Sequence, residues 1–252
     1  MIDIHCHLAY EGLEEIVDAV IQQSKQVKMT GIITCAYPKD LQKNLEIVKK
    51  YPGFVYLSVG LHPIDIKDMT QKEIDAHWDF IREHAEEIVA VGEIGLEKHW
   101  FKEEQLLQRF KEVFIQGLDL AKELNKPVVL HLRKAEQEGF DTVVAENMKD
   151  VVFHYYSGNM TLAKQIVEKK YYISIPATIE NRSTLKDIAK KMPLELLLTE
   201  TDSPFSSPIP NAVNVPQNIK LTIMTIAQLR GITFAEADKQ TTENAKRIFR
   251  LK

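Results

Sequence analysis

The sequence predicts an α/β protein with the fold of a TIM (β/α)8 barrel, in which residues 1–252 form one domain. Eight short β-rich segments alternate with longer amphipathic segments, a pattern typical of parallel strands joined by crossover helices. Apolar runs such as Val128-Val129-Leu130 indicate strands that are buried on both faces. The length of 252 residues agrees with the size of a barrel of eight βα units.

The expected strands and helices alternate along most of the chain. Strands are expected at Ile2–His7, Gly31–Ala36, Phe54–Leu61, Ile88–Glu93, Pro127–His131, Val151–His154, Tyr172–Ile175 and Leu196–Glu200. Apolar residues recur at helical spacing in Leu13–Met29, Gln71–His84, Glu103–Leu124, Thr161–Lys169, Ser183–Met192, Val215–Arg230 and Thr233–Arg250. Thr233 is the expected N-cap of the last helix. The prolines between Asp202 and Pro216 predict a loop after the last strand.

Charge and composition narrow the classes of function. The net charge of −4 argues against a protein that coats nucleic acid, because such proteins neutralise many phosphates with basic residues. The net charge is still compatible with an enzyme that binds one or two phosphates at a metal centre, because the metal ions supply the positive charge. We expect no membrane association, because no apolar run is long enough. Two cysteines and an N-terminus without signal-peptide features predict a cytoplasmic protein. The sequence makes no prediction of oligomeric state.

Histidines and acids cluster where the expected strands end. Because the carboxyl ends of all strands meet at one face of a barrel, these side chains are expected to converge there. Imidazole and carboxylate groups are the usual protein ligands of divalent metals. The sequence therefore predicts a metal site at the C-terminal face of the strands, with the ligands His5, His7, Glu93, His131, His154 and Asp202.

The first strand and the two acids carry most of this prediction. His5 and His7 are separated by one residue, so both point to the same face of a strand while Cys6 points to the other. Glu93 follows an apolar run, where its two oxygens can bridge two ions; a salt bridge at the barrel rim is the alternative. Asp202 is the expected ligand that also accepts a proton from bound water, and a loop-initiating aspartate is the alternative.

Further residues near the strand ends are candidates for substrate contact. His62 is expected to contact substrate or a ligating group, and Arg133 to hold a phosphate oxygen unless it forms a rim salt bridge. Ser157 and Gly158 are expected to begin a helix whose N-terminus binds an anion or is capped in the ordinary way. Two more histidines, His77 and His84, lie in an expected amphipathic helix and are interpreted as solvated.

These motifs, in this order, resemble the TatD family of metal-dependent deoxyribonucleases. The resemblance spans essentially the whole chain and rests on His5-Cys6-His7-Leu8, Gly60-Leu61-His62-Pro63, Gly92-Glu93-Ile94-Gly95-Leu96, Pro127 to His131 with Arg133, His154 with Ser157-Gly158, and Glu200-Thr201-Asp202-Ser203-Pro204. It implies a barrel with two or three divalent ions (magnesium, manganese or zinc) held by the six predicted ligands. It also implies hydrolysis of phosphodiester bonds in DNA, often from the 3′ end of single strands.

The sequence departs from the family pattern around the ligands. Glu97 stands where aspartate is usual, and Val215 replaces glutamate before Pro216. Leu132 and Lys134 replace the common residues that flank Arg133. These changes leave the metal chemistry intact and bear on substrate choice.

In the hypothesis drawn from the sequence, His5, His7 and Asp202 hold one ion, and His131 and His154 hold the other. Glu93 bridges two ions, Asp202 accepts the proton of the attacking water, and Arg133 with Ser157-Gly158 positions phosphate oxygens. One alternative keeps the barrel and metals but hydrolyses esters or amides, as amidohydrolases or an aminoacyl-tRNA deacylase would. Another is a binding protein without catalysis. Fold alone does not decide between these functions.

Overall fold

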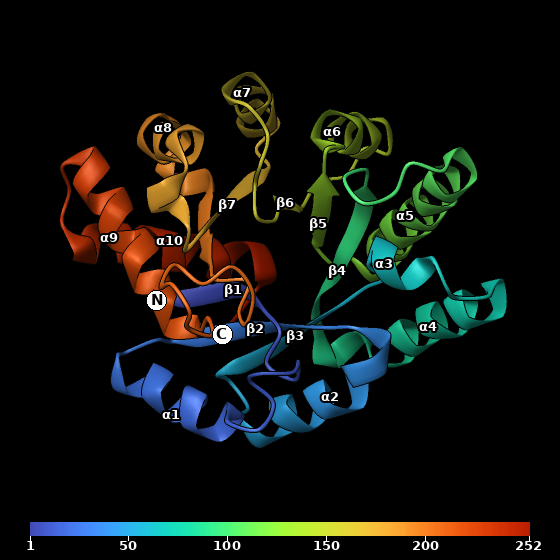
Figure 1. Cartoon of the computed structure of the whole chain (residues 1–252), viewed down its shortest axis with the longest axis horizontal. Coiled ribbons are helices and arrows are strands. Elements are labelled where there is room, and N and C mark those ends of the chain that lie inside the picture. Colours follow the sequence, from blue (N-terminus) through green and yellow to red (C-terminus); the bar gives the residue numbers. More distant parts are fainter.

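The computed structural model describes all 252 residues and contains one eight-stranded parallel sheet. The strands are paired in sequence order from β1 to β8, and the sheet curls into a nearly closed barrel surrounded by helices (Figure 1). The predicted TIM-barrel fold is confirmed. None of the helices combines the length and the apolar character needed to cross a lipid bilayer.

All eight predicted strands form, with changes at their ends. They are β1 Ile2–Cys6, β2 Gly31–Ala36, β3 Val55–Val59, β4 Ile88–Glu97, β5 Val128–Arg133, β6 Val151–Phe153, β7 Tyr172–Pro176 and β8 Leu197–Glu200. The predicted fourth strand ended at Glu93, whereas β4 continues to Glu97. This extension pairs Glu97 with Arg133 and so lengthens β5 beyond His131 as well.

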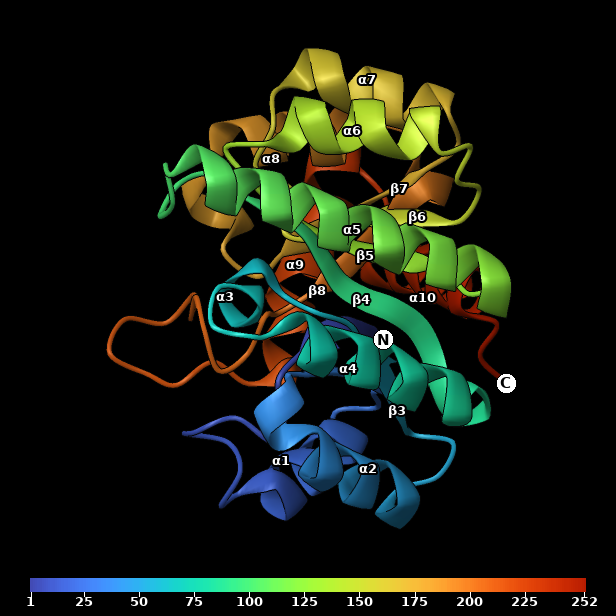
Figure 2. The same ribbon diagram turned by 90° about the vertical axis from the view of Figure 1, so that its right-hand side faces the viewer.

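The helices form the outer layer of the barrel, with further helices after the last strand (Figure 2). They are α1 Val17–Gln26, α2 Leu41–Lys50, α3 Pro63–Ile66, α4 Gln71–Glu83, α5 Glu104–Leu124, α6 Glu136–Ala145, α7 Met160–Glu168, α8 Ser183–Lys191, α9 Ile219–Arg230 and α10 Phe234–Phe249. Helices α2, α3 and α6 were not predicted from the sequence. The predicted N-cap of α10 is confirmed, because the Thr233 side chain accepts a hydrogen bond from Glu236 N.

A small core inside the barrel leaves only one end of the barrel open for a site. Inward-facing residues of the strands, such as Ile4, Ile33 and Val129, form this core together with Ile248 and Phe249 of α10. A larger core of 59 buried residues lies elsewhere, mostly between the sheet and its helices. Helix α10 packs against these inner residues at the end of the barrel where the strands begin. The polar side chains therefore collect at the opposite, C-terminal face.

Hydrogen bonds that one buried carboxyl group accepts help to join β1 to β8 and so close the barrel. Asp3 Oδ1 accepts from Thr201 N (3.0 Å) and His5 N (3.2 Å), and Oδ2 accepts from the Thr201 hydroxyl. Just beyond, Asp202 N donates to His5 O (2.9 Å) and His7 N donates to Ser203 O (2.7 Å). The seam between first and last strand therefore fixes the backbone at three of the predicted ligands.

We predict that Asp3→Ala lowers the free energy of unfolding by about 3 kcal/mol, because it leaves buried N–H and O–H donors without an acceptor. Urea denaturation measures this change. The matched control is Asp187→Ala, which removes an exposed carboxylate paired only with Lys191 and should change stability by less than about 0.5 kcal/mol. Equal losses in the two variants would show that the Asp3 contacts do not hold the seam.

Candidate metal centre

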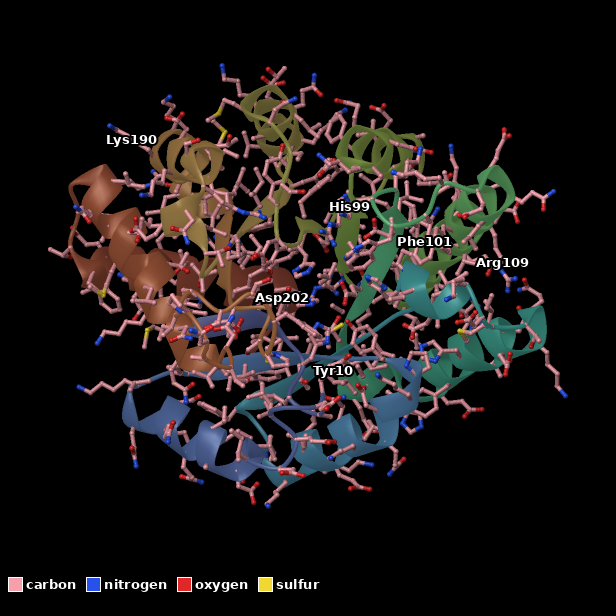
Figure 3. The ribbon with its side chains drawn as sticks, viewed as in Figure 1. Tyr10, His99, Phe101, Arg109, Lys190 and Asp202 are labelled. Carbon is pink, nitrogen blue, oxygen red and sulfur yellow. The ribbon has the colours of Figure 1, made fainter.

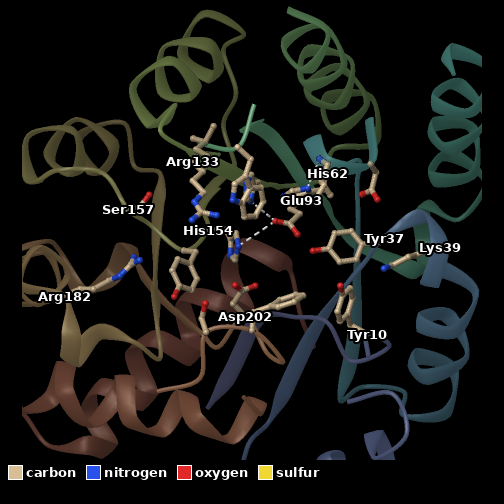
Figure 4. Close-up of a pocket in the computed structure, with 18 residues that line it drawn as sticks. Tyr10, Tyr37, Lys39, His62, Glu93, Arg133, His154, Ser157, Arg182 and Asp202 are labelled. Atoms are coloured by element: carbon tan, nitrogen blue, oxygen red, sulfur yellow. Dashed lines mark hydrogen bonds and ion pairs between the residues drawn. The ribbon is translucent and has the colours of Figure 1, made fainter. Parts of the chain in front are cut away.

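The structure brings all six predicted metal ligands together at the C-terminal face of the barrel. Glu93, His131, His154 and Asp202 line a cavity of about 700 Å³. His5 and His7 are almost fully buried and contact the two carboxylates from β1 and the residue that follows it. Figure 4 shows Glu93 and His154 near the middle of this cavity with Asp202 beside them.

The two oxygens of the Glu93 carboxylate face different pairs of histidines. Oε1 lies 3.8 Å from His5 Nε2 and 3.7 Å from His7 Nε2. Oε2 lies 3.3 Å from His131 Nδ1 and 3.8 Å from His154 Nε2. The carboxylate therefore stands between two groups of potential ligands, as the bridging role predicted from the sequence requires.

Asp202 completes the first of these groups. Its Oδ1 lies 3.5 Å from His7 Nε2 and 3.8 Å from His5 Nε2, and its side chain is 17% exposed to the cavity. Neither Asp202 nor Glu93 forms an ion pair with a lysine or arginine, so the alternative of a salt bridge at the rim is wrong for Glu93.

Hydrogen bonds on the far side of two imidazole rings show that the site fits a metal. His7 Nδ1 lies 3.2 Å from Cys35 O, and His154 Nδ1 lies 2.8 Å from Glu200 Oε2. Because an acceptor on one ring nitrogen holds a proton there, each ring turns its other nitrogen, Nε2, toward the centre. Nε2 atoms of His5 and His7 are 3.3 Å apart, an arrangement that a shared cation would stabilise.

Close approach of β4 and β5 sets the distance between Glu93 and His131. Gly95 has φ +152°, and a Cβ there would lie 2.0 Å from the carbonyl oxygen of His131. Only glycine allows this approach. Farther along the same strand, Glu97 is fully buried and its Oε2 lies 3.3 Å from His131 Nε2. Both nitrogens of His131 thus face carboxylates.

The buried charges perturb each other strongly. Burial opposes ionisation of Glu93, but the neighbouring His62 and His131 hold the pKa of its carboxyl well below the usual value. Burial also disfavours a charged His154, yet the carboxylate of Glu200 raises the pKa of this imidazole to about 9. Burial, together with the nearby His154, pushes the pKa of His5 well below the usual value. The centre therefore combines an anionic carboxylate with imidazoles, and a metal ion at His154 would have to displace a proton.

The predicted substrate-contact residues have different outcomes. His62 and Arg133 line the cavity, and His62 Nδ1 accepts a hydrogen bond from Ile64 N at the start of α3. Arg133 forms no salt bridge; its guanidinium stacks 4.5 Å from the centroid of the Trp100 ring. Ser157 lines the cavity, with its hydroxyl donating to Glu136.

The expectation that Ser157 and Gly158 begin a helix is wrong. Helix α7 begins at Met160, and Asn159 is its N-cap, whose side chain accepts from Leu162 N. Gly158 lies outside the main cavity, and a Cβ there would lie 2.5 Å from the Tyr156 hydroxyl. Its small size is required for packing against Tyr156.

Sequence reasoning also missed or misread several residues. His77 is buried and its Nε2 lies 3.0 Å from Gly60 O, so the expectation of a solvated histidine is wrong. An aromatic and cationic rim surrounds the cavity mouth, and no motif pointed to it. Its members are Tyr10, Tyr37, Lys39, Trp100, Tyr155, Arg182 and Phe205. Most of them lie in loops that follow the strands. Their position after a strand end of a barrel was the only feature of the sequence that could have indicated a place near the site.

A barrel that gathers four histidines and two carboxylates at the open end of its strands defines the class of metal-dependent hydrolases. Residues 2–250 match the family model described as TatD related DNase. The chain therefore belongs to the TatD family.

Relatives support this assignment over full length. An uncharacterized metal-dependent hydrolase of Bacillus subtilis is 34% identical, covering 100% of this chain and 99% of the relative. The human protein named deoxyribonuclease TATDN3 is 29% identical, covering 99% and 94%. The crystal structure of an Escherichia coli TatD homolog superposes with a TM-score of 0.91 at 25% identity, covering 100% and 98%.

We predict that Glu200→Gln weakens divalent-metal binding about tenfold, because the neutral amide has one acceptor oxygen for two donors, His154 Nδ1 and Tyr155 N. Metal titration followed by isothermal calorimetry measures the affinity. Glu195→Gln, an exposed residue close in sequence, is the control and should bind metal like the unmodified protein. Unchanged affinity in Glu200→Gln would exclude a role for this contact in orienting His154.

Proposed function

We propose that this chain is a metal-dependent phosphodiesterase that removes nucleotides from the 3′ end of single-stranded DNA. The observation that carries the proposal is the placement of Glu93 between two groups of histidines, one facing each carboxylate oxygen. Such a site suits two divalent ions close together, an arrangement common in enzymes that hydrolyse phosphate esters. A human relative named as a deoxyribonuclease supports DNA as the substrate.

The proposed ligands divide into two sets that share Glu93. One set is His5, His7 and Asp202, and the other is His131 and His154. His154 also offers a ligand atom within 4.8 Å of those of His5 and Asp202. Bound magnesium, manganese or zinc ions would lower the pKa of coordinated water and offset the negative charge of a phosphate.

Asp202 is the proposed proton acceptor. Its carboxylate is partly exposed to the cavity, whereas Glu93 is 4% exposed and enclosed by imidazoles. The backbone of Asp202 is held by its hydrogen bond to His5 O, so the side chain projects from a fixed point. A carboxylate at this position can take the proton of an attacking water as the water forms its bond to phosphorus.

Arg133 is proposed to hold the non-bridging oxygens of the phosphate. It projects from β5 into the cavity beside His131 and His154, and Figure 4 shows its guanidinium on the same side as Ser157. Because no protein acceptor engages this guanidinium, its donors are available for a paired contact with phosphate.

The test is digestion of a 3′-labelled single-stranded oligonucleotide by metal-stripped protein with added magnesium, manganese or zinc. We expect metal-dependent shortening, and loss of activity in Glu93→Ala. Asp202→Asn should lower kcat by at least about 100-fold, because the amide cannot accept the proton. Arg133→Ala should lose less nuclease activity than Glu93→Ala.

Two results would contradict the proposal. Near-normal activity of Asp202→Asn at saturating metal would remove its assigned role. No cleavage of the oligonucleotide with any metal, although elemental analysis finds bound ions, would redirect the search to carboxylic ester or amide substrates on the same barrel.

A further inference from the structure

Two arginines near the proposed catalytic centre differ from every other arginine of the chain. The others donate hydrogen bonds to protein acceptors; they are Arg82, Arg109, Arg230, Arg247 and Arg250. Arg133 and Arg182 have no such partner, and both line the cavity. Each instead lies over an aromatic ring, Arg133 over Trp100 and Arg182 over Tyr155, at 4.5 and 5.1 Å from the ring centroids.

Both arginine–aromatic pairs are tied to residues of the metal centre. Glu97 Oε1 accepts from His99 N (2.5 Å) and Trp100 N (3.1 Å), while its other oxygen contacts His131. Similarly, Glu200 Oε1 accepts from Tyr155 N (2.6 Å), while its other oxygen contacts His154. One buried carboxylate therefore holds the backbone of each ring-bearing residue near a proposed ligand.

Trp100 is exposed to an unusual degree for so large an apolar side chain. Its exposed fraction is 53%, whereas Trp78 is 5% exposed and hydrogen-bonded to Gln116. An open aromatic face beside a cation is the arrangement that proteins use to stack a nucleobase next to a phosphate.

A second hollow continues from the cavity between Arg133 and Arg182. It has a volume of about 450 Å³ and shares Arg133, Ser157 and Arg182 with the cavity. Lys134 also lines it, and its acidic residue, Glu136, already accepts a hydrogen bond from Ser157. Figure 4 shows Arg133, Ser157 and Arg182 on one side of the centre, opposite Tyr10 and Lys39.

We propose that the adjoining part of the cavity and this hollow hold the single DNA strand beyond the linkage being cleaved, with a base stacked on Trp100 in the cavity and the next phosphate bound by Arg182, which lines both. This inference rests on the proposed phosphodiesterase function and adds a subsite to it. The enzyme then requires an unpaired strand, because a base inside a duplex cannot stack on a protein ring. It also prefers substrates longer than a dinucleotide, because shorter ones do not reach Arg182.

Intrinsic fluorescence tests the stacking, because the chain has two tryptophans and only Trp100 is exposed. The probes are phosphorothioate-linked oligothymidylates of two and six nucleotides, which resist hydrolysis, added to the metal-loaded protein. We expect the hexamer to quench the fluorescence and to bind at least about tenfold more tightly than the dimer. A hexamer that binds without quenching, or no tighter than the dimer, would overturn the proposal.

Variants separate the ring from the charge, with binding followed by anisotropy of a fluorescein-labelled hexamer. Trp100→Leu should weaken binding about tenfold, and Trp100→Phe, which keeps a ring, should weaken it much less. Arg182→Ala should reduce the slope of log affinity against log salt by about 0.7, the value for one phosphate contact. Equal effects of leucine and phenylalanine, or an unchanged salt slope, would contradict the subsite.

The matched control is Lys190→Ala, which removes a positive charge from the far end of α8. Lys190 is exposed, forms no ion pair and lies at the outer edge of the molecule in Figure 3. Its salt slope should equal that of the unmodified protein.

The two proposals can fail separately. If the phosphorothioate probes show quenching and length dependence but the unmodified oligonucleotide is not hydrolysed, the subsite is supported and the proposed function is refuted. If the unmodified oligonucleotide is hydrolysed but the probes show neither effect, the proposed function is supported and the subsite is refuted.

Discussion

Asp3 joins the first strand of the barrel to the residues after the last one, and the metal centre is built across that junction. Its carboxylate accepts from the backbone of His5 and from Thr201, one residue before Asp202. The chain thereby brings together ligands that are about 200 positions apart in sequence. Because a buried carboxylate must satisfy its hydrogen bonds, any displacement of β1 from β8 leaves polar groups unpaired. The same hydrogen bonds of Asp3 therefore close the barrel and align the proposed ligands.

Around this junction, buried carboxylates orient the residues of the site. Glu200 contacts His154 and the backbone of Tyr155, and Glu97 contacts His131 and the backbone of Trp100. Each acid therefore contacts one proposed ligand and the backbone of one aromatic residue of the rim. In the proposed function, these two side chains would couple the position of a metal ligand to that of a substrate contact.

The sequence was sufficient to predict the barrel and the convergence of the ligands. Strand ends such as those bearing His154 are local features, and the barrel topology then brings them to one face. The sequence was not sufficient to predict the aromatic and cationic rim of the cavity. Trp100 and Arg182 lie in loops, and their proximity to Arg133 and Tyr155 depends on contacts between the ends of neighbouring strands, β4 with β5 and β6 with β7, that no local pattern encodes. Helices α2 and α6 were missed among short polar segments, and the extension of β4 to Glu97 depends on pairing with β5.

The central claim is that Glu93 separates two metal positions. Anomalous diffraction from crystals soaked in manganese tests this most directly, since it locates each ion without depending on activity. The account predicts two peaks, one beside Glu93 Oε1 near His5 and His7, and one beside Oε2 near His131 and His154. A single peak away from Glu93, or no peak at saturating manganese, would contradict the account.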